Sequence, residues 1–127
     1  MYQIDNQSRM AVYEQIVAQI ESYVLAGVLP SGAKLPSVRG MSVELGANPN
    51  TVQRAYTKLE DGGIVVTSPG RGAFIVDGAA DILREKRIDT DKRAYSAIVQ
   101  RLHNMGVEKS ALLDIVEKSY QEDNGDD

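Results

Sequence analysis

The chain has 127 residues, an apolar fraction of 43% and a formal net charge of −4. This length suits one domain, or one small domain with an appendage, and the apolar fraction is sufficient for a folded core. There is no cysteine, which excludes disulfides, thiolate metal sites and cysteine nucleophiles. The N-terminus lacks a signal-peptide pattern, and no apolar run approaches the roughly 20 residues that span a membrane. We therefore expect a cytoplasmic protein without a membrane segment.

The acidic charge is not spread evenly along the chain. Residues 1–76 contain six basic and six acidic residues, so the net charge of −4 comes entirely from the remaining part. Attraction to phosphates acts over a Debye length of about 10 Å and depends on the local patch of charge. The net charge therefore does not exclude a nucleic-acid partner.

A first helix is predicted from Ala11 to Leu25. Its apolar residues recur at the spacing of one buried helical face, at Val12, Ile16, Ile20, Tyr23 and Val24. Gly27 follows as a left-handed cap. The two prolines and the glycine between Leu29 and Pro36 predict an ordered loop.

Two short helices are predicted next. Ser37 is a good N-cap for a helix from Val38 to Leu45, which would bury Val38, Met41 and Leu45 and end at Gly46. Asn48 then caps a second helix that starts at Pro49, where a missing N–H costs nothing. The second helix would end at Gly62 and bury Val52, Ala55, Tyr56 and Leu59. Helix, short turn and helix make a helix-turn-helix.

A β-hairpin is predicted directly after the second helix. Its strands are Ile64–Thr67 and Ala73–Val76, and Pro69–Gly72 has the composition of a turn. A hairpin at this position corresponds to a wing. The predicted fold is therefore α+β, with a winged helix-turn-helix domain over residues 1–77.

The remaining residues 78–127 are predicted to be helical. Ala79–Asn104 can form one helix, in which Asp89–Asp91 is the weakest part and could be a kink. Gly106 breaks this helix, a second follows over Glu108–Tyr120, and the acidic tail Gln121–Asp127 is expected to fray. Two amphipathic helices of this size cannot bury their apolar faces alone, so they pack on the first domain or on another copy.

Polar side chains occupy the exposed face of the second helix of the pair: Asn50, Gln53, Arg54, Thr57 and Lys58. Asparagine, glutamine and arginine read base edges in the major groove of DNA. The alternative is a solvated polar face without a ligand. DNA binding is favoured because the face carries no acid before Glu60 and lies in a helix-turn-helix.

Two further arginines suggest an external anion. Arg39 lies in the first turn of its helix, where the helix dipole disfavours a cation; the alternative is a salt bridge to Glu44 or to a C-terminal acid. Arg71 lies between Gly70 and Gly72 at the predicted turn, where it could enter a minor groove or bind a phosphate. A plain flexible hairpin is the alternative there.

Enzyme and metal chemistry find little support. His103 is the one histidine and is expected to pack on a helix surface. No compact pair of carboxylates lies in an apolar setting. Asp77, Asp81, Asp89 and Asp91 could gather at a cation, although a solvated, partly frayed segment is simpler. We expect no catalytic residues, no metal and no cofactor.

Four separated motifs occur in order: Leu29–Arg39, Asn48–Tyr56, Leu59–Ile64 and Gly70–Phe74. Together they resemble the DNA-binding domain of GntR-family transcription regulators, and the resemblance as a whole covers about 70 residues. The Asn-Pro-Asn-Thr-Val-Gln phrase and the opening at Val12–Ile16 are similar to the short, YtrA-like branch of that family. The last 51 residues are too few for the larger effector-binding domains of other branches.

The resemblance implies contacts between DNA and the arginine of the Leu-Pro-Ser-x-Arg motif, the polar start of the recognition helix and the wing-tip glycine. By position these residues are Arg39, Asn50, Thr51, Gln53, Arg54 and Gly70. With the residues considered above, the full predicted DNA surface is Lys34, Ser37, Arg39, Asn48, Asn50, Thr51, Gln53, Arg54, Thr57, Lys58, Gly70, Arg71 and Gly72. Pro69 stands at a wing position that is often basic in the family, which removes one phosphate contact.

Members of the YtrA-like branch dimerise through a C-terminal helix pair. They are typically repressors of adjacent transporter operons or of their own genes. The resemblance thus implies a homodimeric repressor on an inverted-repeat operator of double-stranded DNA. The dimerisation residues would be Ile82, Tyr95, Ile98, Val99, Leu102, Met105, Leu112, Leu113, Val116 and Tyr120.

Two other hypotheses remain. The winged helix could be a protein–protein interaction module, which would require an apolar recognition face in place of Asn50, Gln53 and Arg54. An unidentified small-molecule effector or metal could also bind the C-terminal helices or the crevice between the domains. Binding of an effector or a metal is compatible with DNA binding. No motif in the sequence indicates which ligand would bind.

Overall fold

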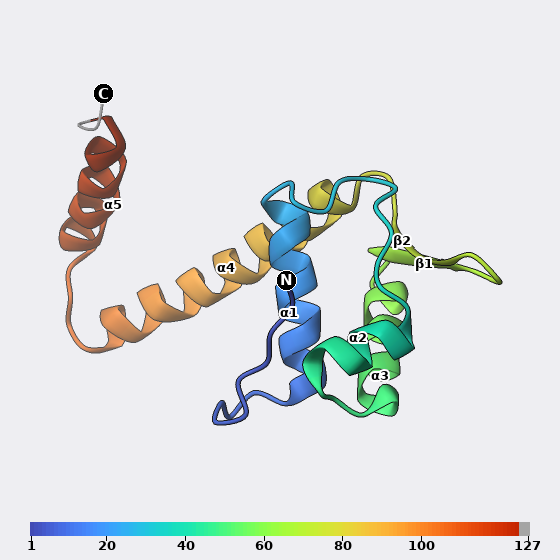
Figure 1. Cartoon of the computed structure of the whole chain (residues 1–127). Helices are drawn as coiled ribbons and strands as arrows, with labels where there is room; N and C mark the ends of the chain where they lie inside the picture. Colours follow the sequence, from blue (N-terminus) through green and yellow to red (C-terminus); the bar gives the residue numbers. More distant parts are fainter. Residues whose placement is uncertain (125–127) are drawn as a thin grey trace. The chain divides into compact units, whose positions relative to one another are not determined.

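A computed structural model describes residues 1–124 of the chain, with side chains to Glu122. The chain divides into two compact units, Met1–Lys86 and Arg87–Asp127. The element order is α1 (Val12–Leu25), α2 (Val38–Leu45), α3 (Pro49–Asp61), β1 (Val65–Ser68), β2 (Gly72–Ile75), α4 (Ala79–Asn104) and α5 (Lys109–Asn124), shown in Figure 1. The predicted winged helix-turn-helix followed by two helices is confirmed.

The helix pair has the predicted limits and caps. The Ser37 Oγ accepts a hydrogen bond from the Gly40 N–H at 2.9 Å, and the Asn48 Oδ1 accepts one from the Asn50 N–H at 2.8 Å. Gly46 ends α2 in the left-handed conformation with φ +66°, which a residue with a Cβ adopts only at a cost. The two N-caps, Ser37 and Asn48, each satisfy a helix N–H that would otherwise have no partner.

Packing of α3 forms the centre of the first unit. Helices α1 and α2 and strand β1 all contact α3, and the four α3 residues predicted to be buried are buried, namely Val52, Ala55, Tyr56 and Leu59. From α2, Met41 is fully buried, whereas Val38 and Leu45 are half-buried at the edge of the core. Amphipathic spacing therefore predicted the buried face of α3.

The N-terminal segment lies against α1, an arrangement that was not predicted. The side-chain amide of Gln19 donates to the Gln3 carbonyl at 2.7 Å and accepts from the Gln3 N–H at 2.9 Å. Gln15 binds the main chain of Asp5 in the same two ways. Tyr2 is buried, with its ring edge-to-face against Tyr23 at a centroid distance of 5.6 Å.

The wing is a two-stranded antiparallel hairpin with one additional pairing segment. The strands pair in a register from Val65 opposite Ile75 to Ser68 opposite Gly72, one residue away from the predicted limits. The predicted loop also pairs with β2, because the Leu35 N–H donates to the Ala73 carbonyl at 2.9 Å and the Ile75 N–H donates to the Ala33 carbonyl at 2.9 Å. The loop is therefore extended here and forms part of the wing.

Helix α4 is one α-helix and continues through Asp89–Asp91. An ion pair of 2.9 Å between Asp89 and Arg93, one helical turn apart, lies in this stretch. Gly106, with φ +88°, follows the end of α4. Helix α5 extends to Asn124, so fraying does not start at Gln121 as predicted, and the last three residues lie outside the described part. None of the helices in residues 1–124 combines the length and the apolar composition of a membrane span.

Substitution of Val52 by alanine tests the central role of the α3 core. The side chain is fully buried, so we expect Val52→Ala to lower the free energy of unfolding by about 1.5–3 kcal/mol. Val43→Ala is the matched control, because Val43 is 78% exposed on α2 and should change the stability by less than about 0.5 kcal/mol. Urea unfolding followed by circular dichroism measures both. Equal losses in the two variants would contradict this placement of the core.

Candidate nucleic-acid interface

The exposed face of α3 presents the predicted polar residues. Asn50, Gln53, Arg54, Thr57 and Lys58 are all exposed, on the side of the helix opposite its buried residues. Thr51, implied by the family resemblance, is half-buried at the edge of this face. The face begins at the N-terminus of α3, where the helix dipole attracts anions. Its composition and position suit a nucleic acid.

Four of these side chains have contacts within the protein. The Arg54 guanidinium lies over the ring of Tyr13 on α1, with its central carbon 3.8 Å from the ring centroid, and the Lys58 Nζ lies 5.9 Å from the same centroid. The Gln53 side-chain amide donates to the Thr57 Oγ1 at 3.2 Å. Sequence reasoning did not identify Tyr13, because the contact joins two helices that are far apart in the chain.

Helix α2 supplies Arg39 from its first turn, where the residue is exposed. Among the described residues, Arg39 takes part in no ion pair, and Glu44 instead lies 3.7 Å from the N-terminal ammonium. The structure therefore does not contain the salt bridge between Arg39 and Glu44 that was the alternative to DNA binding. The predicted residues Ser37 and Asn48 are exposed and act as the caps of α2 and α3.

The wing brings Lys34 beside the glycine turn. Gly70 and Arg71 are exposed in the turn, and Gly72 is half-buried at the start of β2. Gly72 has φ +118°, and a Cβ built there would lie 3.1 Å from the Lys34 Cε. Glycine at this position therefore lets the Lys34 side chain lie against the hairpin, beside the residue that follows Arg71. The sequence alone did not predict this proximity.

A hydrogen bond connects the end of α3 to the wing. The Thr67 Oγ1 on β1 donates to the Glu60 Oε2 at 2.9 Å. The carboxylate of Glu60 is thus directed to the hairpin, at the opposite end of α3 from Asn50. Because α3 and β1 also pack on each other, the recognition face and the wing are held together as parts of one unit.

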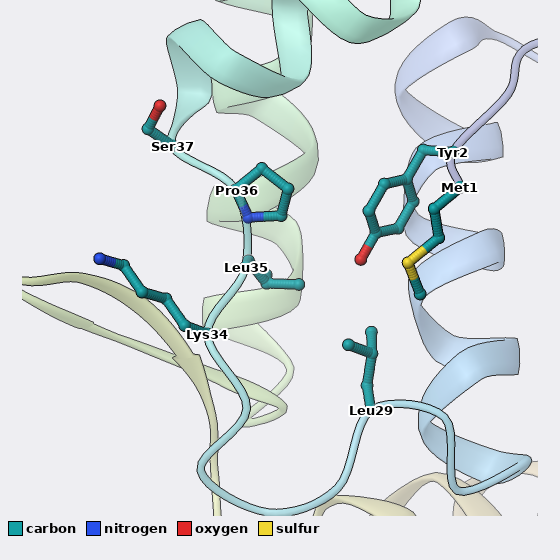
Figure 2. A pocket seen from close by; sticks show the side chains of 7 residues that line it. All are labelled: Met1, Tyr2, Leu29, Lys34, Leu35, Pro36 and Ser37. Atoms are coloured by element: carbon teal, nitrogen blue, oxygen red, sulfur yellow. The ribbon is translucent and has the colours of Figure 1, made fainter.

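The backbone between Lys34 and Ser37 is held by contacts on the side opposite to the Lys34 and Ser37 side chains. Met1, Tyr2 and the segment from Leu29 to Ser37 line a depression of about 530 Å³. In Figure 2, Leu35 points toward Tyr2 and Leu29, whereas Lys34 and Ser37 point the other way. The buried Tyr56 hydroxyl donates to the Pro36 carbonyl at 2.7 Å. Burial, with smaller contributions from Tyr2 and Glu44, raises the pKa of Tyr56 above its ordinary value of 10.0, so the hydroxyl remains a donor at neutral pH.

Charge in the first 76 residues is concentrated on this surface. Five of the six bases in that part belong to the predicted DNA surface: Lys34, Arg39, Arg54, Lys58 and Arg71. Two of the acids on the same elements are already engaged, Glu44 near the N-terminal ammonium and Glu60 with Thr67. A domain without net charge thus presents cations where a polyanion would bind.

The second unit presents apolar side chains to solvent. Between Arg87 and Glu122, none of the described side chains is buried. Of the predicted dimerisation residues, Val99, Leu102, Leu112 and Val116 are half-buried, and the exposed ones are Ile82, Tyr95, Ile98, Met105, Leu113 and Tyr120. His103 is exposed in the last turn of α4, and the described residues contain no group of three metal-binding side chains.

Comparison with known proteins identifies the relatives of this chain. The pattern of the bacterial regulatory proteins of the gntR family matches residues 12–75. The HTH-type transcriptional repressor YtrA of Bacillus subtilis is 40% identical over 112 residues, which covers 88% of this chain and 86% of that protein. The matching region contains both the helix pair and the wing described above.

Solved structures agree with this relationship. A transcriptional regulator from Oenococcus oeni is 30% identical, with a TM-score of 0.79 over 92% of this chain and 97% of that one. YtrA from Sulfolobus acidocaldarius, a GntR-family transcription factor, is 26% identical, with a TM-score of 0.54 over 95% of this chain and 97% of that one. The similarity therefore extends beyond the winged helix to nearly the whole length of each chain.

Substitution of Tyr56 by phenylalanine tests the support of the segment that carries Lys34 and Ser37. Loss of the bond to the Pro36 carbonyl should lower the free energy of unfolding by about 1 kcal/mol at neutral pH. Because the folded pKa of Tyr56 is raised, its stabilising contribution is complete below the unfolded pKa and is lost as the pH rises above about 10. The difference between wild type and Tyr56→Phe should therefore shrink in alkali. Urea unfolding of both proteins from neutral pH to about pH 11 measures it, and a constant difference would contradict the assignment.

Proposed function

Because the chain belongs to the GntR family of bacterial regulatory proteins, we propose that it is a homodimeric repressor that binds an inverted-repeat operator. It is a DNA-binding transcription regulator of the YtrA-like type. Its homologues are transcription regulators and not enzymes. The proposal goes further in stating that two copies place their recognition helices on one operator. Because the DNA of a bacterial cell lies in the cytoplasm, we also propose that the protein acts there.

The observation that carries this proposal is the acid-free polar face at the start of α3. Asn50, Gln53 and Arg54 are exposed there, and they are the residue types that pair with adenine and guanine edges. A protein–protein interaction module would need an apolar face at this position, as most interface cores are apolar. The exposed polar face therefore favours DNA as the partner of α3.

Dimerisation is supported by the unburied apolar side chains of α4 and α5. Helices of this length gain most of their stability in water from packing an apolar face, and no described side chain from Arg87 to Glu122 is buried. A second copy of the same chain would cover the same faces by two-fold symmetry. Two recognition helices related by this symmetry would reach half-sites about one helical turn apart.

Repression requires only that the dimer occupy DNA that the transcription machinery needs. The Bacillus subtilis relative is named as a repressor, which supports the same direction of control here. The bases of the wing and of α2 would neutralise phosphates, while α3 would supply the sequence preference. Affinity and specificity thus come from different residues, and they can be separated by mutation.

Two arginine substitutions test this separation on a duplex selected from random DNA by the wild-type protein. Arg54→Ala should weaken binding to that duplex by about 1–3 kcal/mol and relax the preference at one position. Arg71→Ala should weaken binding to all sequences alike and reduce the slope of log K against log salt by about 1. Fluorescence anisotropy over a salt series measures both effects, with Arg87→Ala on α4 as the control that removes an arginine outside the predicted surface.

The results of these measurements distinguish base recognition by Arg54 from phosphate binding by Arg71. If the wild-type protein selects no sequence, the proposed function is wrong. If Arg54→Ala weakens all duplexes equally, α3 does not read a base through this residue.

Substitution of Ile98 tests the dimer. Ile98 is 44% exposed on α4, and Ile98→Asp would place a carboxylate in the proposed interface, where burial of an unpaired charge is strongly unfavourable. We expect the wild type to sediment at twice the mass of the chain and the variant to shift toward the monomer. Gln100→Asp, at an exposed position outside the predicted apolar set, should leave the dimer intact. A wild-type monomer at micromolar concentration would contradict the proposal.

A further inference from the structure

The contact between Arg54 and Tyr13 joins the recognition helix to a helix that is not predicted to touch DNA. The guanidinium carbon lies over the Tyr13 ring, 3.8 Å from its centroid, a separation that fits a guanidinium packed with its flat face on the ring. Arginine stacks on aromatic rings through this flat face, with attraction from both the charge and the delocalised electrons. The contact lies within the first unit, between α1 and α3.

Stacking leaves the edge of the guanidinium available. The N–H donors of arginine lie in the plane of the group and point outward from its edge. Recognition of guanine uses two of these in-plane donors, which pair with the O6 and N7 atoms in the major groove. An arginine whose face rests on a ring can therefore pair with a base through its edge at the same time.

The ring of Tyr13 is a stable support. Tyr13 is half-buried, packs against the core of the first unit, and lies in the first turn of α1. Helix α1 is anchored to the same core by the buried residues Ile16 and Ile20, and it packs directly on α3. The position of the ring relative to α3 is thus set by the main packing contact of the unit.

An arginine side chain has several rotatable bonds and loses their freedom when it binds a base. A side chain that is already held in one orientation loses less, and therefore binds more tightly and more selectively. We propose that Tyr13 is a positioning residue for base recognition, whose ring holds Arg54 with its edge directed at a guanine of the operator. This inference rests on the proposed function, since it requires that α3 enters the major groove.

The test uses the duplex that the wild-type protein selects, together with variants of it substituted at single base pairs. Dissociation constants are measured at one salt concentration for the wild type, Tyr13→Phe, Tyr13→Leu, Arg54→Ala and the double variant Tyr13→Leu/Arg54→Ala. Tyr13→Phe keeps the ring and should bind within about twofold of the wild type. Tyr13→Leu should lose about three- to tenfold in affinity and lose preference at the same base pair as Arg54→Ala.

The double variant separates positioning from a general structural effect. If Tyr13 acts through Arg54, the double variant binds like Arg54→Ala alone, because no arginine remains to be positioned. An equal loss from Tyr13→Leu in both backgrounds would overturn the inference. A loss in Tyr13→Phe as large as in Tyr13→Leu would overturn it too, since the hydroxyl and not the ring would then matter.

A measurement without DNA checks the stack directly. The side-chain protons of Arg54 should be shifted upfield by the ring current in the wild type and in Tyr13→Phe, and an unshifted spectrum in the wild type would overturn the inference even if Tyr13→Leu failed to fold. Failure of the wild type to select any sequence would remove the proposed function and this inference together. Selection by the wild type with unchanged specificity in a folded Tyr13→Leu would remove only this inference.

Discussion

The packing of α3 on α1 is the contact on which the rest of the first unit depends. It buries Val52 and Leu59 in the centre of the core, and this fixes which side of α3 faces outward. The same contact places Tyr13 of α1 beside Arg54 of α3. One apolar interface therefore decides both the stability of the domain and the orientation of a side chain on its polar surface, because a helix that is fixed on one face presents the other face in a fixed direction.

The wing is attached to this centre by main-chain and side-chain hydrogen bonds on two sides. Leu35 and Ala33 pair with β2, and Thr67 on β1 binds Glu60 at the end of α3. The predicted phosphate-binding residues of the wing are thus placed by backbone pairing, and the predicted base-reading residues by helix packing. Both sets belong to the same compact unit. A destabilising substitution in the core would therefore lower the affinity for DNA even though every predicted DNA-contact residue is unchanged.

Local patterns in the sequence were sufficient for the helix limits of the pair, both N-caps, the buried face of α3 and the position of the hairpin. These features depend on residues that are neighbours in the chain. The contact of Tyr13 with Arg54 and the pairing of Ala33–Leu35 with β2 could not be predicted in this way, because they join segments that meet only in the folded chain. The DNA contacts and the dimer interface stay predictions, since both require a second molecule.

The pairing of the N-terminal segment with α1 has a consequence for how this sequence can change during evolution. Gln15 and Gln19 each use both the donor and the acceptor of the side-chain amide to bind main-chain groups of Asp5 and Gln3. Gln3 contributes only its main chain to this pairing, so many residue types are tolerated at its position. Glutamate at position 15 or 19 would keep the acceptor but lose the donor. Substitution of Gln15 or Gln19, two residues of α1 that lie one helical turn apart, would therefore disturb the docked segment more than substitution of Gln3 would.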